Sequence, residues 1–132
     1  MILILRQTAA NASLALFDRW AWKKILRWRN KLQKEFPVIS ILLKEYYKTA
    51  PIIVEKINAE ANPEYIYRYL WNNFIAKAYA LVCQGEMHET ANIYIAMMTA
   101  LCKHYGIILS DDVTNAIESF TSCHNRHRGV RD

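Results

Sequence analysis

Apolar residues recur every three or four positions between Leu14 and Phe36, which is the spacing of one face of an α-helix. This apolar stripe consists of Leu14, Phe17, Ala21, Ile25, Trp28, Leu32 and Phe36. The same helical register lines up basic residues on the other side, with two tryptophans at its flanks. These are Arg19, Lys23, Arg27, Lys31 and Lys34, flanked by Trp20 and Trp22. The pattern therefore predicts an amphipathic helix of about six turns with one apolar and one strongly basic face.

Prolines and glycines divide the rest of the chain into shorter periodic segments. Pro37 and Pro51 both suit the first turn of a helix, where a missing N–H is tolerated. Asn62-Pro63-Glu64 adds an N-cap side chain and an acidic first turn, and Gly85 and Gly106 suit helix ends. These signals predict five further helices, over about 38–48, 51–57, 63–84, 86–105 and 110–120.

The predicted fold is an all-α, single-domain bundle of about six helices, with a helical hairpin around Gly85. The chain of 132 residues contains only three Gly and three Pro, too few for the many turns of a sheet-rich fold. We expect the domain to cover residues 1–124. From Asn125 onward the sequence has no apolar stripe, so residues 125–132 are predicted to form a mobile basic tail.

Charge is divided unequally along the chain. Residues 1–50 contain ten Lys and Arg and three acidic residues, which gives a net charge of +7. Residues 51–132 contain seven Lys and Arg and nine acidic residues, which gives a net charge of −2. Such asymmetry favours an anionic partner for the first half: an acidic protein, nucleic acid or a membrane surface. A solvated helix face without a partner explains the same charges about equally well.

The cysteines and the chain start indicate a cytoplasmic protein. Cys83, Cys102 and Cys123 are odd in number and no secretion signal is evident, so we expect reduced thiols. The apolar run Ile2–Leu5 is far too short for a signal-peptide core or a membrane span, and we expect it to lie against the domain. We predict no transmembrane segment.

Catalytic and metal-binding motifs are scarce. The three glycines are scattered, so no phosphate-binding loop exists, and His88-Glu89 lacks the second histidine of a zinc-protease motif because Asn92 occupies that position. Two short clusters hold borderline metal ligands: Cys102 with His104, and Cys123 with His124 and His127. Their spacing is unlike a zinc knuckle, so we expect core or surface roles without a metal, although the sequence leaves open whether they converge. We expect no cofactor and no enzymatic activity.

Part of the chain resembles a known bacterial family. The cluster Arg27-Trp28-Arg29-Asn30, the run from Tyr46-Tyr47 through Ala50-Pro51 to Val54, and the Tyr94-Ile95-Ala96-Met97 pattern are similar to the CFI-box C-terminal domain. The resemblance covers about residues 25–105 and implies an all-helical domain of bacterial or phage origin, without implying an activity. Asn30 stands where the family usually has Asp, and the start Ile2–Leu5 lacks the Cys-Phe-Ile signature.

Three hypotheses for function follow from the basic helix. The first is a non-enzymatic protein-binding module of adaptor, inhibitor or immunity type, which engages an acidic surface through the basic residues, Trp20 and Trp22. The second is nucleic-acid backbone binding by the same residues. The third, peripheral membrane attachment, requires the apolar stripe to be free. A homo-oligomer is compatible with each of them. If the first two helices pack antiparallel, Glu45 is placed to form an ion pair with Arg27 or Arg29, and such a structural role is favoured over a catalytic one.

Overall fold

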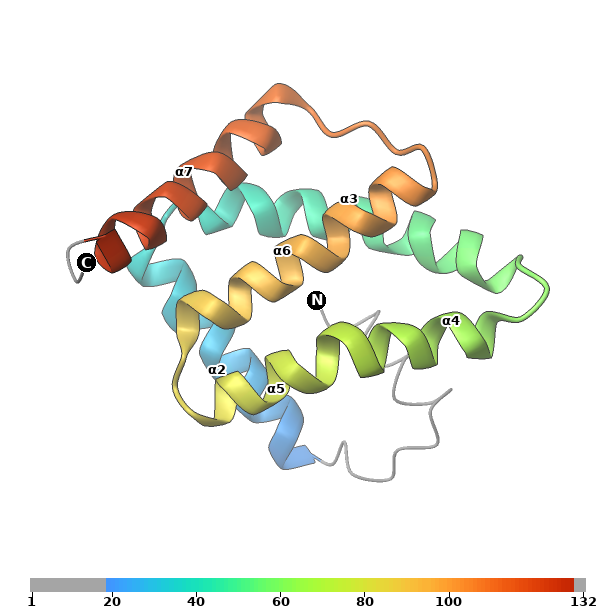
Figure 1. Cartoon of the computed structure of the whole chain (residues 1–132), viewed down its shortest axis with the longest axis horizontal. Coiled ribbons are helices and arrows are strands. Elements are labelled where there is room, and N and C mark those ends of the chain that lie inside the picture. Colours follow the sequence, from blue (N-terminus) through green and yellow to red (C-terminus); the bar gives the residue numbers. More distant parts are fainter. Residues whose placement is uncertain (1–18, 130–132) are drawn as a thin grey trace.

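The computed structural model describes the backbone of residues 19–129 and the side chains of residues 23–122, and every regular element in this part is helical. In chain order the elements are α2 (Arg19–Glu35), α3 (Ile39–Asn58), α4 (Pro63–Leu70), the π-helical turn η1 (Trp71–Ile75), α5 (Ala76–Cys83), α6 (Met87–His104) and α7 (Asp111–Gly129). Because α4, η1 and α5 follow one another without a break, residues 19–129 contain five separate helices (Figure 1). The all-α, single-domain prediction is confirmed, and the predicted total of about six helices is close.

The difference in helix number arises at Pro51. We placed the start of a short helix there, but Pro51 lies inside the single helix α3. The residues before and after it, including Ala50 and Ile53, are buried in the same core, whereas Pro51 itself is exposed. Burial of both halves of α3 therefore outweighs the missing N–H and the steric clash that proline brings to a helix interior.

The other predicted helix boundaries are set by local hydrogen bonds. The Asn62 side chain accepts a bond from the Tyr65 N–H at 3.2 Å and caps α4. At Gly85 and Gly106 the backbone has positive φ values of 78° and 67°. The following residues, Glu86 and Ile107, donate their N–H groups back to Leu81 and Cys102, which is the Schellman arrangement that ends a helix. The turn at Gly85 joins α5 to α6, and this confirms the predicted hairpin.

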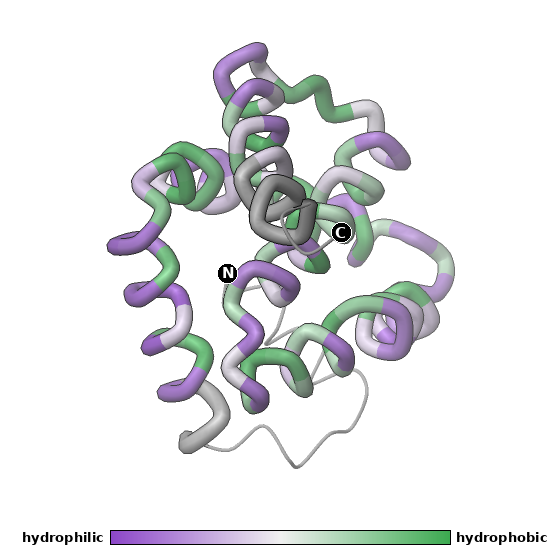
Figure 2. The backbone as a smooth tube through the Cα atoms, turned by 60° about the vertical axis from the view of Figure 1, so that its left-hand side comes forward, coloured by the Kyte–Doolittle hydropathy of each residue, from purple (hydrophilic) through white to green (hydrophobic). Residues whose placement is uncertain are grey.

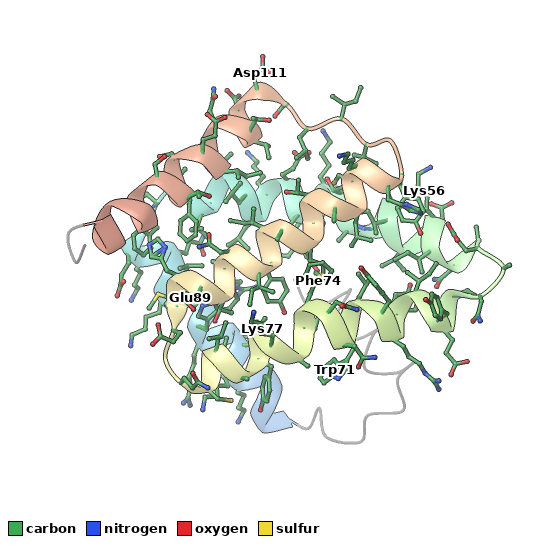
Figure 3. All side chains as sticks on the ribbon, viewed as in Figure 1. Lys56, Trp71, Phe74, Lys77, Glu89 and Asp111 are labelled. Atoms are coloured by element: carbon green, nitrogen blue, oxygen red, sulfur yellow. The ribbon has the colours of Figure 1, made fainter. Side chains whose placement is uncertain are left out.

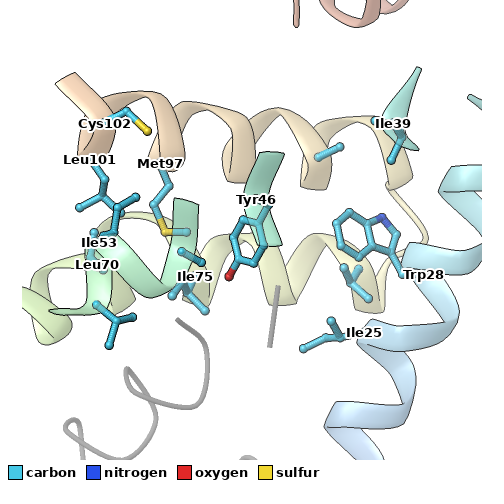
Figure 4. Close-up of a cluster of buried hydrophobic side chains, with 14 of the residues drawn as sticks. Ile25, Trp28, Ile39, Tyr46, Ile53, Leu70, Ile75, Met97, Leu101 and Cys102 are labelled. Atoms are coloured by element: carbon cyan, nitrogen blue, oxygen red, sulfur yellow. The ribbon is translucent and has the colours of Figure 1, made fainter. Parts of the chain in front are cut away.

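Helix α6 occupies the centre of the bundle. It contacts α2, α3, α5 and α7, while α3 and α7 lie side by side (Figure 1). Each helix carries both hydrophobic and hydrophilic positions (Figure 2), and the hydrophobic ones supply one continuous core (Figure 4). Its largest fully buried side chains come from four segments: Tyr67, Phe120, Ile53, Ile57, Ile75, Met97 and Thr90.

An aromatic stack ties the ends of three helices together. His88 at the start of α6 lies on the Phe120 ring of α7, with ring centroids 4.3 Å apart and nearly parallel planes. Phe36, just after α2, meets the same histidine edge-on at 4.3 Å.

Helix α7 continues as helical backbone to Gly129, beyond Asn125, where we placed the start of the tail. The apolar residues Ile2–Leu5, Leu14 and Phe17 lie outside the described part of the chain.

Candidate functional site

The apolar stripe of α2 is buried over the described residues. Ile25 and Leu32 are each 3% exposed and Trp28 is 7% exposed. The Trp28 indole lies on the Tyr94 ring of α6, with centroids 5.7 Å apart, and its Nε1–H donates to the Met87 carbonyl at 3.3 Å. Figure 4 shows Ile25 and Trp28 directed from α2 into the core. These contacts fix the rotation of α2 and thereby decide which side chains face solvent.

Four of the predicted partner-binding residues lie together on the outer side of α2. Lys23, Arg27, Lys31 and Lys34 are all exposed, and we call this set the basic face. Their spacing of three or four residues places them on neighbouring turns over roughly 16 Å of helix. Arg19, Trp20 and Trp22 belong to the α2 backbone, but their side chains lie outside what the structure describes.

The basic face has no neutralising partner among residues 23–122. None of its four cations forms an ion pair there, whereas Arg68 pairs with Glu64 at 2.8 Å on α4. Helix α2 contains seven basic residues and a single acidic one, Glu35, which gives it a charge of +6. Like charges this close repel one another and attract anionic groups from solvent. Positive charge is therefore concentrated on α2, and four of its cations lie on the exposed side.

Arg29, which is half-buried on α2, connects this helix to α3. Its Nη1–H donates to the Tyr47 hydroxyl at 2.7 Å, and Nη2–H donates to the Asn30 side chain at 3.3 Å. The predicted ion pair of Glu45 with Arg27 or Arg29 is not formed. Arg29 binds the Tyr47 hydroxyl instead, and the Glu45 carboxylate accepts a hydrogen bond from the Thr49 hydroxyl at 3.4 Å. Tyr47 is 53% exposed, so its ring is accessible to solvent beside Arg29.

The crowded aromatic residues of α4 separate into buried and exposed groups. Tyr67 is fully buried, and its hydroxyl donates to the Asn58 side chain at the end of α3 at 2.9 Å. Burial, together with the nearby Tyr105, raises the pKa of Tyr67 to about 12. Tyr65 and Tyr69 are 67% and 52% exposed. In Figure 3, Phe74 lies between the α4–α5 rod and α6, whereas Trp71 points away from α6.

The candidate metal ligands show no convergence within the described side chains. Cys102 is 3% exposed in the core, and burial, with Glu45 nearby, raises the pKa of its thiol. His104 is exposed on the other side of the helix end, with Nε2 4.0 Å from a Glu60 carboxylate oxygen. Residues 23–122 contain no group of three potential ligands. The side chains of Cys123, His124 and His127 lie outside this range, so the expectation that they bind no metal stays a prediction.

One feature of the structure was not predicted from the sequence. A cavity of about 100 Å³ lies among α2, α3, α6 and α7, on the inner side of the helix that carries the basic face. Its walls consist of ordinary core residue types at ordinary helical spacing, among them Leu42, Tyr46, Tyr94 and Met98. No local sequence signal distinguishes them, because the cavity depends on how four helices meet.

Comparison with known proteins adds no relative. No family model matches the chain, and neither a curated protein nor a solved structure was found to be similar to it. The resemblance to the CFI-box C-terminal domain thus stays a prediction. Within residues 19–129, none of the helices combines the length and apolar character needed to cross a bilayer.

Proposed function

We propose that the protein is a small helical binding module whose basic face engages an acidic surface of another protein. The observation that carries this proposal is the set of four exposed cations on α2, without an ion-pair partner among residues 23–122. A helix charged only to keep a domain soluble would be expected to mix both signs, as i, i+4 pairs between opposite charges stabilise it. An adaptor, an inhibitor or an immunity protein would use such a surface without catalysing a reaction.

A further feature of α2 favours a protein as the partner. Arg29 and the half-exposed Tyr47 are held together by a hydrogen bond between α2 and α3. Arginine and tyrosine are the types that contribute most to protein–protein affinity, because they combine a large contact area with directional hydrogen bonds. The cations would steer association with an acidic partner, and the Arg29–Tyr47 pair would supply part of the contact.

Nucleic acid and membrane are less well supported. The four cations of the basic face span only roughly 16 Å, which limits the number of phosphates they can contact at one time. They lie on a single helix, and residues 19–129 place no second groove-binding helix beside it. Membrane attachment through α2 would need its apolar stripe, but Ile25, Trp28 and Leu32 are buried in the core. Both alternatives serve as outcomes of the test below.

The test compares two triple variants that remove the same charge. Lys23→Gln, Arg27→Gln and Lys31→Gln neutralise the basic face, whereas Lys56→Gln, Lys77→Gln and Lys103→Gln neutralise three exposed lysines on α3, α5 and α6. Figure 3 labels Lys56 and Lys77 on helices other than α2. Fluorescence anisotropy would measure binding to labelled poly-glutamate, to a thymidine 20-mer and to anionic phospholipid vesicles.

We expect poly-glutamate to bind the wild-type chain and the control variant alike, and the basic-face variant at least tenfold more weakly. An equal loss of affinity in both variants would show that binding depends only on the net charge of the chain. That result would contradict the proposal that the basic face is the binding site. Tighter binding of the 20-mer than of poly-glutamate, with a steep salt dependence, would replace the proposal by nucleic-acid binding. Preferential vesicle binding would replace it by membrane attachment.

A further inference from the structure

The cavity between α2, α3, α6 and α7 is half-open to solvent. Interiors are packed to the density of organic crystals, and voids larger than a water molecule are few. Here about 100 Å³ remains between helices that all contribute side chains: Trp28 and Leu32 from α2, Leu42 and Tyr46 from α3, Tyr94 from α6 and Val113 from α7. In Figure 4, Trp28 and Cys102 lie towards opposite ends of the buried cluster, with Tyr46 between them.

The surface of the cavity is almost entirely apolar, although Arg29 and Glu45 belong to its lining. Tyr94 is partly buried, and desolvation next to Tyr46 holds its pKa well above the usual value of 10, so the hydroxyl keeps its proton. Burial likewise keeps the Cys102 thiol in its neutral form. The two ionised groups, Arg29 and Glu45, have opposite charge and are only partly buried. The lining therefore has no net charge, and its apolar surface compensates poorly for the desolvation of an ionic ligand.

Aromatic and sulfur-containing side chains distinguish this cavity from a purely aliphatic one. The rings of Trp28, Tyr46 and Tyr94 line it together with the thioether of Met98 and the thiol of Cys102. Aromatic faces and edges prefer a further aromatic ring at stacked or edge-on distance, and sulfur atoms also contact ring edges favourably. An apolar cavity of roughly 150 Å³ in another protein takes up benzene, so about 100 Å³ suits a single small ring.

We propose that this cavity is a binding site for a small, uncharged molecule with one aromatic ring. The site is independent of the basic face, which lies on the opposite side of α2. Thr99 provides the access point, because its side chain is exposed and yet belongs to the lining. A ligand would enter between α6 and the elements that face it, and its ring would contact Trp28, Tyr46 and Tyr94.

The experiment uses the full chain and three probes: toluene, phenol and benzoate. Binding is followed by ¹H–¹⁵N chemical-shift changes and by the increase in Tm. We expect toluene and phenol to bind and to shift the backbone amides of Tyr94, Met98 and Cys102, whereas benzoate, which carries a charge, should bind at least tenfold more weakly.

Two substitutions and a matched control locate the binding. Ala91→Leu extends a buried side chain into the cavity, and Thr99→Trp blocks its edge without altering the core. Ala100→Trp is the control, since Ala100 is the exposed neighbour of Thr99 outside the lining. Toluene affinity should fall at least tenfold in Ala91→Leu and Thr99→Trp, and less than twofold in Ala100→Trp.

Three results would overturn the proposal. They are no toluene binding to the wild-type chain, benzoate binding as tight as that of toluene, or equal effects of Thr99→Trp and Ala100→Trp. If Ala91→Leu fails to fold, the comparison of Thr99→Trp with Ala100→Trp still shows whether toluene binds in the cavity.

Discussion

The basic face should reduce the stability of the fold, and Arg27 is the position at which this can be measured. Arg27 lies four residues after Lys23 and four before Lys31, and all three side chains are exposed. Like charges at this spacing destabilise a helix by roughly 0.2 to 0.5 kcal/mol per pair, and opposite charges stabilise it by similar amounts. Lys24, three residues before Arg27, adds a third like-charge pair. Arg27→Glu turns these three repulsions into attractions, so the free energy of unfolding should rise by roughly 1 to 3 kcal/mol. Arg27→Gln should achieve about half of this gain.

Urea unfolding at low ionic strength, followed by circular dichroism, measures the change. In about 1 M NaCl, where charges are screened beyond roughly 3 Å, the gain of Arg27→Glu should shrink to a few tenths of a kcal/mol. Lys77→Glu on α5 is the matched control, because Asn73, Phe74, Ala80 and Leu81, three and four residues away, carry no charge. If Arg27→Glu lowers stability, or if its gain is insensitive to salt, Arg27 makes a stabilising contact and the reasoning fails.

Four further predictions concern the scaffold and are checked by the same unfolding measurements. Pro51→Ala should stabilise the chain by about 1 to 2 kcal/mol, because it restores an N–H and removes a clash inside α3; a loss would mean that the proline is favourable there. Gly85→Ala should cost about 1 to 2 kcal/mol, since φ is +78° although space for a methyl group is open, and Gly85→Asn should cost less. Ile53→Ala should cost about 2 to 5 kcal/mol, and the exposed Ile52→Ala less than about 1. The free energy of unfolding should fall as the pH rises from about 10 towards 12, because tyrosine ionises near pH 10 in the unfolded chain and Tyr67 only near pH 12 in the folded one. Tyr67→Phe should make this fall smaller, and it should lower the free energy of unfolding at neutral pH by about 1 kcal/mol.

The predictions from sequence were most accurate where a local interaction determines the structure. The Asn62 cap and the positive-φ glycines act within a few residues, so their residue types alone located helix ends. Pro51 shows the opposite case. Its local preference for a helix start is real, but Ala50 and Ile53 pack into one core, and this tertiary burial keeps α3 continuous. No short segment contains that information.

The candidate site divides in the same way. The four residues of the basic face repeat with a helical period, opposite the apolar stripe of the same helix. This spacing was enough to predict that their side chains are exposed. The partner of Arg29 could not be predicted, because Tyr47 and Glu45 are close in sequence and only the packing of α2 on α3 selects between them. The cavity requires the positions of four helices at once.

The most direct test of the central proposal is a residue-level map of where an acidic chain binds. A ¹H–¹⁵N titration of the full chain with unlabelled poly-glutamate at low salt would provide this map. The account predicts that the largest shift changes fall on residues 23–34 and around Tyr47, and that they disappear in the variant that neutralises Lys23, Arg27 and Lys31. Changes centred on other helices or on residues 125–132, or changes that persist in this variant, would contradict it.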